Sequence, residues 1–168
     1  MPIEKQPLDR AIDSALKYLS FRPRSATELK IWLSKRFSPT VTHSVLAKMR
    51  CDRLVDDLKF SEFWVNNRSA YRPRSSRLIH RELLMKGISQ DIADEAVYHI
   101  DDEEMARRVA LDRSKKISHL SESLFFKKMI AHLQRRGFPF SGSQQAARHA
   151  WKQIEADHCT EISAPIGI

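Results

Sequence analysis

Glycine and cysteine are scarce in this 168-residue sequence, and long apolar runs are missing altogether. Four glycines are far below the usual share of about 7%, and they leave few residues for hairpin turns that need positive φ. This scarcity argues strongly against an all-β fold. No uncharged apolar run reaches the roughly 18 residues of a membrane-spanning helix. The start carries Glu4 and no apolar segment, so we expect no secretory signal.

The two cysteines, Cys51 and Cys159, lie far apart and form neither a CxxC pair nor a disulfide framework. We expect them to be reduced thiols in a cytoplasmic protein.

Motifs that carry catalysis are also missing. The sequence contains neither of the phosphate-binding patterns GxGxxG and GxxxxGK, and no HExxH zinc motif. The acidic run Asp101–Glu104 lacks the spacing of a calcium loop, and we interpret it as a solvated helix start. His80 and His132 are more typical of ordinary helix side chains than of metal ligands. We predict that the protein is no enzyme and binds no cofactor or metal.

Apolar residues recur at helical spacing along nearly the whole chain and define nine amphipathic stripes. Pro23, Pro39, Pro73 and Pro139 all fall between stripes, where a missing N–H does least damage. Helix starts are indicated by the capping box Ser25-Ala-Thr-Glu28 and by Ser38 before Pro39. Further cap candidates are Asp56, Ser75 or Ser76, Ser89, and Ser121 or Ser123. Gly87 and Gly137 indicate helix ends.

The sequence repeats itself at intervals of about 50 residues. Arg22-Pro23-Arg24-Ser25 recurs as Arg72-Pro73-Arg74-Ser75, and a Leu-x-x-basic-Gly pattern at Leu83–Gly87 recurs at Leu133–Gly137. We predict an all-α fold of three tandem three-helix repeats, stacked into an elongated, curved array. The expected divisions are an N-terminal tail 1–7, repeats at 8–54, 55–100 and 101–155, and a polar C-terminal tail 156–168 ending in Pro165-Ile-Gly-Ile.

The formal net charge of +8 is unevenly distributed. Residues 22–86 hold 15 basic and 6 acidic side chains, residues 91–104 hold 7 acidic and no basic ones, and residues 107–152 hold 11 basic and 2 acidic ones. Basic residues cluster at similar places in each repeat, which suggests a basic stripe suited to a long polyanion or a filament. The predicted partner-binding residues are Arg22, Arg24, Lys35, Arg36, Arg72, Arg74, Arg77, Arg81, Lys86, Lys127, Lys128, Arg135 and Arg136. Many of these could instead merely solvate or finish helices.

Several aromatic side chains could in principle stack on nucleic-acid bases, namely Trp32, Phe60, Phe63, Trp64 and Trp151. All five lie on apolar stripes, so we interpret them as core residues. Tyr71 is the aromatic residue with the weakest case for burial.

These residues resemble the RecX family of bacterial regulatory proteins. The best match is Leu54-Val55-Asp56-Asp57-x-x-Phe60, followed by Trp64, Arg68 and Arg77-Leu78-x-x-x-Glu82-Leu83-x-x-Lys86-Gly87-Ile88. Weaker matches are Leu8-Asp9-Arg10-Ala11, Arg24-Ser25-x-x-Glu28-Leu29 and Leu133-x-x-Arg136-Gly137-Phe138. The chain departs from the family pattern at Arg36, where a glycine usually ends the helix, and at Arg72-Pro73-Arg74. Among the motif residues, we interpret Asp57, Phe60, Trp64, Glu82, Leu83 and Gly87 as structural.

The resemblance implies a non-enzymatic, cytoplasmic regulator that binds the RecA recombinase. Such a protein lies in the groove of the RecA filament on single-stranded DNA and suppresses its recombinase, ATPase and coprotease activities, and thereby modulates DNA repair, recombination and the SOS response. It implies contact with single-stranded DNA that is independent of sequence and weaker alone, no membrane contact, and a monomer.

Two other readings stay open. A sequence-independent DNA-binding module acting without RecA would also use repeated basic faces. A helix-turn-helix transcription factor is a third option, although no unit stands out as carrying a recognition helix.

Overall fold

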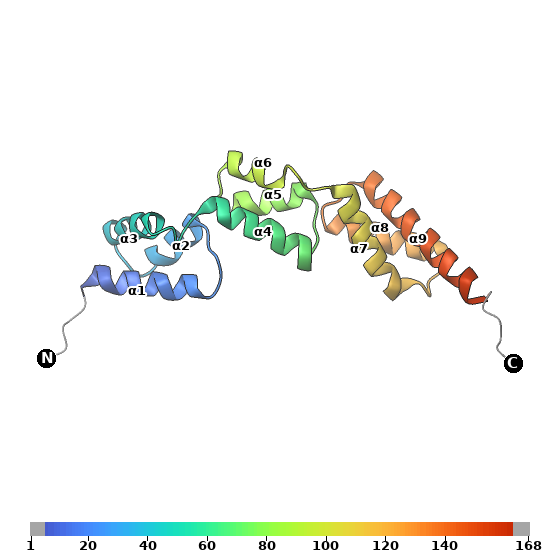
Figure 1. The fold of residues 1–168 in the computed structure, drawn as a ribbon, viewed down its shortest axis with the longest axis horizontal. Coiled ribbons are helices and arrows are strands. Elements are labelled where there is room, and N and C mark those ends of the chain that lie inside the picture. Colours follow the sequence, from blue (N-terminus) through green and yellow to red (C-terminus); the bar gives the residue numbers. More distant parts are fainter. Residues whose placement is uncertain (1–5, 163–168) are drawn as a thin grey trace. The chain divides into compact units, whose positions relative to one another are not determined.

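The computed structural model describes residues 6–162, with side chains through residue 157, and this part of the chain contains nine α-helices and no strand (Figure 1). The predicted all-α class is therefore confirmed. The helices are α1 Pro7–Ser20, α2 Ala26–Ser34, α3 Pro39–Cys51, α4 Asp57–Tyr71, α5 Ser76–Met85, α6 Gln90–Val97, α7 Asp102–Ile117, α8 Glu122–Arg135 and α9 Phe140–Ile162.

The last helix extends past the expected end of the third repeat. We expected a polar tail from residue 156, but α9 continues through Ile162. The segment 156–162 contains no proline or glycine to stop the helix, and the next proline is Pro165. At the other end, α1 begins at Pro7, one residue before the expected start. The parts of the two predicted tails at 1–5 and 163–168, with Pro165-Ile-Gly-Ile, lie outside the described residues, as does the side chain of Cys159. Cys51 is a free, exposed thiol.

Helix boundaries follow the predicted signals. Ser25 and Glu28 form the capping box of α2, and Ser38 caps α3 before Pro39. Asp56 Oδ1 accepts the N–H groups of residues 58 and 59, and Ser75 Oγ accepts that of residue 78. Ser89 and Ser121 occupy the N-cap positions of α6 and α8 without a side-chain bond.

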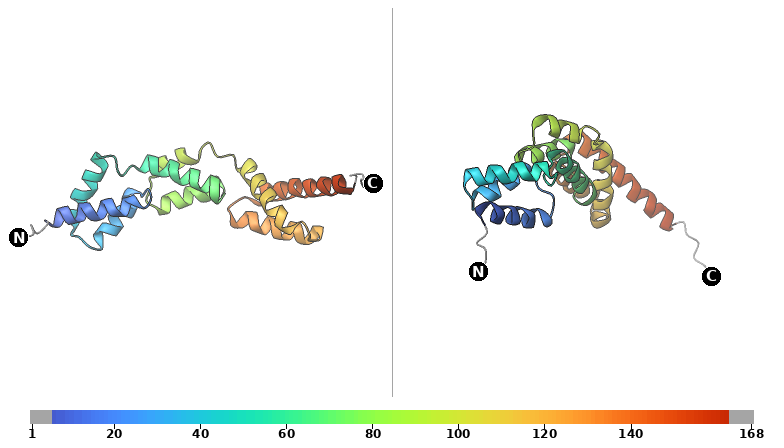
Figure 2. Two further views of the ribbon diagram at one scale, coloured as in Figure 1. Left: turned by 60° about the horizontal axis from the view of Figure 1, so that its bottom comes forward. Right: turned by 60° about the vertical axis from the view of Figure 1, so that its left-hand side comes forward.

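The first and third repeats each bury an apolar cluster formed by their own helices. In the first, the cluster includes Ala15, Leu29, Leu33, Val45 and Met49. In the third, it includes Ala110, Phe125, Met129, Leu133 and Ala147, and α7, α8 and α9 pack on one another in both views of Figure 2. The second repeat buries Phe60, Ile79, Leu83, Ile88 and Ala93.

The candidate base-stacking aromatics are packed inside the protein, as expected. Phe60 is buried, and the half-buried Trp64 stacks on it at 5.9 Å between ring centroids. Trp32 stacks on Tyr18 at 4.6 Å, and Trp151 packs against Phe125 at 4.9 Å. Phe63 is also half-buried beside Phe60. Tyr71, in contrast, is 81% exposed.

The described chain forms two compact units whose boundary does not coincide with the repeats. The first comprises the described residues through Asn67 together with His80–Tyr98, and the second comprises Arg68–Ile79 together with the residues from His99 onward. Helices α4 and α5 therefore contribute residues to both units. The repeat boundaries at 54/55 and 100/101 and the elongated, curved array stay predictions.

Candidate partner-binding surface

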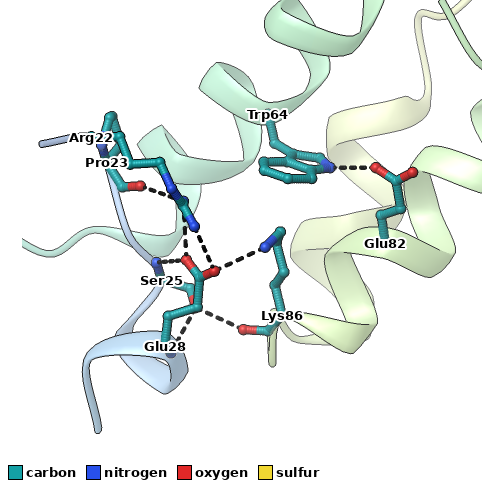
Figure 3. Close-up of polar contacts among 7 residues, drawn as sticks. All are labelled: Arg22, Pro23, Ser25, Glu28, Trp64, Glu82 and Lys86. Atoms are coloured by element: carbon teal, nitrogen blue, oxygen red, sulfur yellow. Dashed lines mark hydrogen bonds and ion pairs between the residues drawn. The ribbon is translucent and has the colours of Figure 1, made fainter. Parts of the chain in front are cut away.

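In the loop before α2, the charge of Arg22 is neutralised by the carboxylate of Glu28, which lies in the first turn of α2. Arg22 places Nη2 3.0 Å from Oε1 and Nη1 3.4 Å from Oε2 of Glu28, as Figure 3 shows. Lys86 Nζ lies 2.8 Å from the same Oε1. Burial alone would raise the pKa of Glu28, but the hydrogen bonds from Arg22 and Lys86 outweigh it and hold the pKa below its ordinary value.

Lys86 contacts three residues: Glu28, Trp64 and Ser25. Its Nζ sits 4.2 Å above the ring centroid of Trp64, and Trp64 Nε1 in turn donates to Glu82 Oε2 at 2.8 Å (Figure 3). Its carbonyl accepts a 2.7 Å hydrogen bond from Ser25 Oγ. Two residues predicted to bind a partner are thus paired with Glu28: Arg22 inside the first repeat, and Lys86 across the contact between the first and second repeats.

We call this contact region the first joint: residues 25–28 with Asp57, Lys86 and Gly87. The first N–H groups of α2 have no partner inside the helix, so they can donate hydrogen bonds across this joint. Asp57 Oδ1 accepts the N–H of Ala26 at 2.9 Å. Gly87 has a φ of 77°, and a Cβ there would lie 2.2 Å from Thr27 Oγ1. Asp57 and Gly87 thus take part in this joint, Glu82 accepts from Trp64, and Phe60 and Leu83 are buried. The interpretation of these motif residues as structural stays a prediction.

A second joint repeats this arrangement between the second and third repeats. It consists of residues 73–78 with Asp102, Arg136 and Gly137. Asp102 Oδ1 accepts the N–H of Ser76 at 2.6 Å, and the carbonyl of Arg136 accepts the N–H of Ser75 at 3.0 Å. Gly137 has a φ of 92°, and a Cβ there would lie 2.4 Å from Ser75 Oγ.

The two joints differ in charge. Leu78 occupies the position of Glu28, fifty residues further on. Arg136, the counterpart of Lys86, instead donates from Nη1 to the Pro73 carbonyl at 2.9 Å and from Nε to His132 Nε2 at 3.1 Å. Burial and the charge of Arg113 lower the pKa of Arg136. Burial, followed by the charges of Arg68, Arg136 and Arg72, likewise lowers the pKa of Arg74. The second joint is thus an accumulation of like charges.

The other predicted residues are placed as follows. Arg24 lies 4.2 Å from the Tyr18 ring centroid, and Arg36 lies 4.4 Å from that of Trp32. Eight of the thirteen predicted partner-binding residues are exposed: Lys35, Arg36, Arg72, Arg77, Arg81, Lys127, Lys128 and Arg135. These eight are the ones whose charge faces solvent. A single stripe through all three repeats stays a prediction.

Sequence reasoning missed the basic side chains of α7. Arg108, Arg113 and Lys116 line a cavity of about 300 Å³ together with Arg136 and His132. These residues have no basic counterparts fifty residues earlier, where Leu58, Phe63 and Asn66 stand, so the fifty-residue repetition of charge does not include them. The signal that could have found them is their spacing along one helix: Arg108 and Lys116 lie eight residues apart on one face of α7, and Arg113 lies beside that face.

Within residues 6–157, no three His, Cys, Asp or Glu side chains gather where they could hold a metal ion. None of the helices in the described part of the chain is long and apolar enough to cross a membrane.

The first two repeats match models of known three-helix domains. Residues 11–49 match the first three-helix domain of RecX, and residues 56–97 match the second. A protein of Corynebacterium efficiens named regulatory protein RecX is 32% identical over 145 residues, which cover 81% of this chain and 69% of that protein. A protein of the same name from Amycolatopsis mediterranei is 28% identical and is covered to 83%.

A solved structure has the same fold. The crystal structure of RecX from Lactobacillus salivarius matches with a TM-score of 0.70 at 22% identity, and the match covers 86% of this chain and 96% of that one. The matched part covers between 52% and 85% of the length of the curated relatives.

Proposed function

The chain belongs to the RecX family of regulatory proteins, and from this premise we propose that it binds RecA and the filament that RecA forms on single-stranded DNA, and lowers the filament's recombinase, ATPase and coprotease activities. In the cell this would modulate DNA repair and the SOS response. The observation that carries the proposal is the family match itself, which extends over two RecX three-helix domains and most of the chain.

The distribution of charge supports a polyanionic or acidic partner. Arg77 and Arg81 lie one turn apart on α5 and are both exposed, as are Lys127 and Lys128 on α8. Cations with this exposure keep their charge available to carboxylates and phosphates of a partner. Arg22 and Lys86 are removed from the proposed contact set because Glu28 holds them. Several modest contacts from one chain to one filament would add through avidity.

The test is RecA's DNA-dependent ATPase with less than one copy of this protein per RecA. We expect inhibition at substoichiometric amounts. Unchanged ATPase and unchanged filament length at equimolar protein would defeat the proposal.

Charge reversal at Arg77 and Arg81 tests whether these two side chains contact the filament. The double variant Arg77→Glu/Arg81→Glu should fold, because both side chains are exposed, and should need roughly tenfold more protein for half inhibition, the change that about 1.4 kcal/mol of lost binding produces. The matched control is Arg148→Glu/Lys152→Glu, an exposed pair one turn apart on α9 outside the predicted set. Equal losses in both double variants would show that only net charge matters.

The rival function is binding to DNA without RecA. The cationic cavity beside α7 favours it, because four basic side chains line one small space. A pure DNA binder would bind naked single strands strongly, with an affinity that falls steeply with salt, and would show no preference for RecA-coated strands.

A further inference from the structure

A cavity in the second unit brings together four cationic side chains, one of which, Arg136, also belongs to the second joint. It has a volume of about 300 Å³ and lies among the end of α4, α7 and α8. Its charged lining consists of Arg108, Arg113, Lys116 and Arg136 against the single carboxylate of Asp112. Tyr71, His132 and the Pro73 carbonyl region complete the wall.

The helix geometry explains why three of the cations meet. Arg108, Asp112 and Lys116 follow one another at intervals of four residues, so they lie on one face of α7, and Arg113 flanks that row. Arg108 also donates to the Ser69 carbonyl, which ties its guanidinium to the end of α4. Arg136 is fixed from the opposite side by its bonds to the Pro73 carbonyl and to His132. Two of the four cationic groups, Arg108 and Arg136, are thus held in place before any ligand binds.

One side chain of the lining has a donor that is buried without a hydrogen bond. Arg113 Nε is shielded from solvent and has no partner among the described residues. A buried donor without a partner costs free energy. The Arg113 guanidinium is thus not neutralised by any acceptor at Nε, and its charge adds to that of the other three cations in the lining.

The pKa of His132, which lines the cavity, reflects the burial of its imidazole and the positive charge around it. Burial, then the charges of Arg136, Arg113 and Arg135, lower the pKa of His132 to about 4. His132 is therefore neutral at pH 7, and its Nε2 accepts from Arg136. The groups that face it from α7 and α8 are cationic apart from Asp112, which is exposed. The cavity has an excess of positive charge.

We propose that this cavity binds a phosphate group, either free or as a phosphodiester of single-stranded nucleic acid. Arginine guanidinium groups match phosphate oxygens in pairs, and lysine adds a point charge. Four cations around one small space suit an oxyanion with several acceptor oxygens better than a single carboxylate. The phosphodiester source rests on the proposed function, whereas binding of free phosphate does not.

The test follows the imidazole resonances of His132 in the full-length protein at pH 7, assigned with the variant His132→Gln. Inorganic phosphate and a thymidine oligonucleotide are titrated separately into wild type, Lys116→Gln and Arg113→Gln. The matched control is Lys115→Gln, which removes an exposed charge next to Lys116 but outside the cavity lining. A pH titration with and without phosphate measures the pKa of His132, which a bound anion should raise.

We expect a saturable shift in wild type and in Lys115→Gln, with affinity reduced roughly tenfold in Lys116→Gln and Arg113→Gln. If the oligonucleotide produces the same saturable shift, the phosphate comes from nucleic acid. If only inorganic phosphate does, the site takes a free phosphate group. No saturable shift with either ligand, or equal losses in Lys115→Gln and Lys116→Gln, overturns the proposal. Lys116 is exposed, so its variant tests the site even if Arg113→Gln fails to fold. A protein that passes this test without lowering RecA's ATPase keeps the site and loses the proposed function.

Discussion

At the scale of single residues, Glu28 decides what the cations around it can do. Its carboxylate is 17% exposed and holds Arg22 and Lys86, which are 34% and 18% exposed. Leu78 holds the equivalent position in the next repeat, and there the arginines repel one another. The exchange of Glu28 for Leu78 thus removes from the second joint the carboxylate that neutralises the first.

Replacing Glu28 with Gln should lower the free energy of unfolding by about 2 kcal/mol, because two half-buried cations lose a charged hydrogen-bond acceptor. Urea unfolding at pH 7 measures this, with Glu62→Gln, an exposed carboxylate on α4, as the control. Because the folded pKa of Glu28 lies below its ordinary 4.5, its stabilisation is complete well above pH 4.5 and is lost as the pH falls through the folded pKa. A loss no larger than that of Glu62→Gln would contradict the ion-pair account.

His132 should make the protein less stable in mild acid. Folding lowers the pKa of His132 from the ordinary 6.5 to about 4. Between these two pH values the imidazole is therefore mostly protonated in the unfolded chain and mostly neutral in the folded chain. The free energy of unfolding should therefore decline from pH 6.5 to pH 4, and His132→Gln should flatten that decline. Thermal unfolding across this range measures it, with the exposed His149→Gln as the control. Parallel curves for wild type and His132→Gln would refute the assignment.

At the scale of elements, the sequence predicted the starts and stops of helices better than their contacts. The capping residues Ser25 and Ser38 and the stops Gly87 and Gly137 are local signals, readable within a few positions. The bond from Ala26 to Asp57 joins residues 31 apart, and its counterpart joins Ser76 to Asp102, 26 apart. Because these two separations differ, the fifty-residue repeat of the sequence does not align the two bonds.

The helix-ending glycines should be the least replaceable positions of the joints. Gly87→Ala should cost at least about 2 kcal/mol, because positive φ strains an L-residue and the new Cβ meets Thr27. Combining it with Thr27→Gly should recover only the part due to the steric clash. Gly142→Ala on α9 is the control: its φ is not positive and the nearest side-chain atom is 3.7 Å away, so it should be neutral or stabilising by up to about 1 kcal/mol. Equal effects of the two alanines in urea unfolding would rule out the close approach.

At the scale of the whole molecule, the net charge of +8 comes from two basic segments around an acidic one. The sequence predicted thirteen contact residues from the repetition of these charges, but it could not show which ones the fold neutralises. Arg22 and Lys86 are neutralised by a carboxylate that is six positions away from one and 58 from the other. The α7 cations were missed because they belong to one repeat only.

The central claim is that the partner is RecA assembled on DNA rather than either component alone. Equilibrium binding of the labelled full-length protein to RecA-coated single-stranded DNA, to RecA and to the bare strand, at one salt concentration, tests it most directly. The account predicts that the filament is bound about tenfold or more tightly than either component, because contacts to both add in one complex. Equal affinity for bare and coated strands, or no binding to the coated strand, would contradict it.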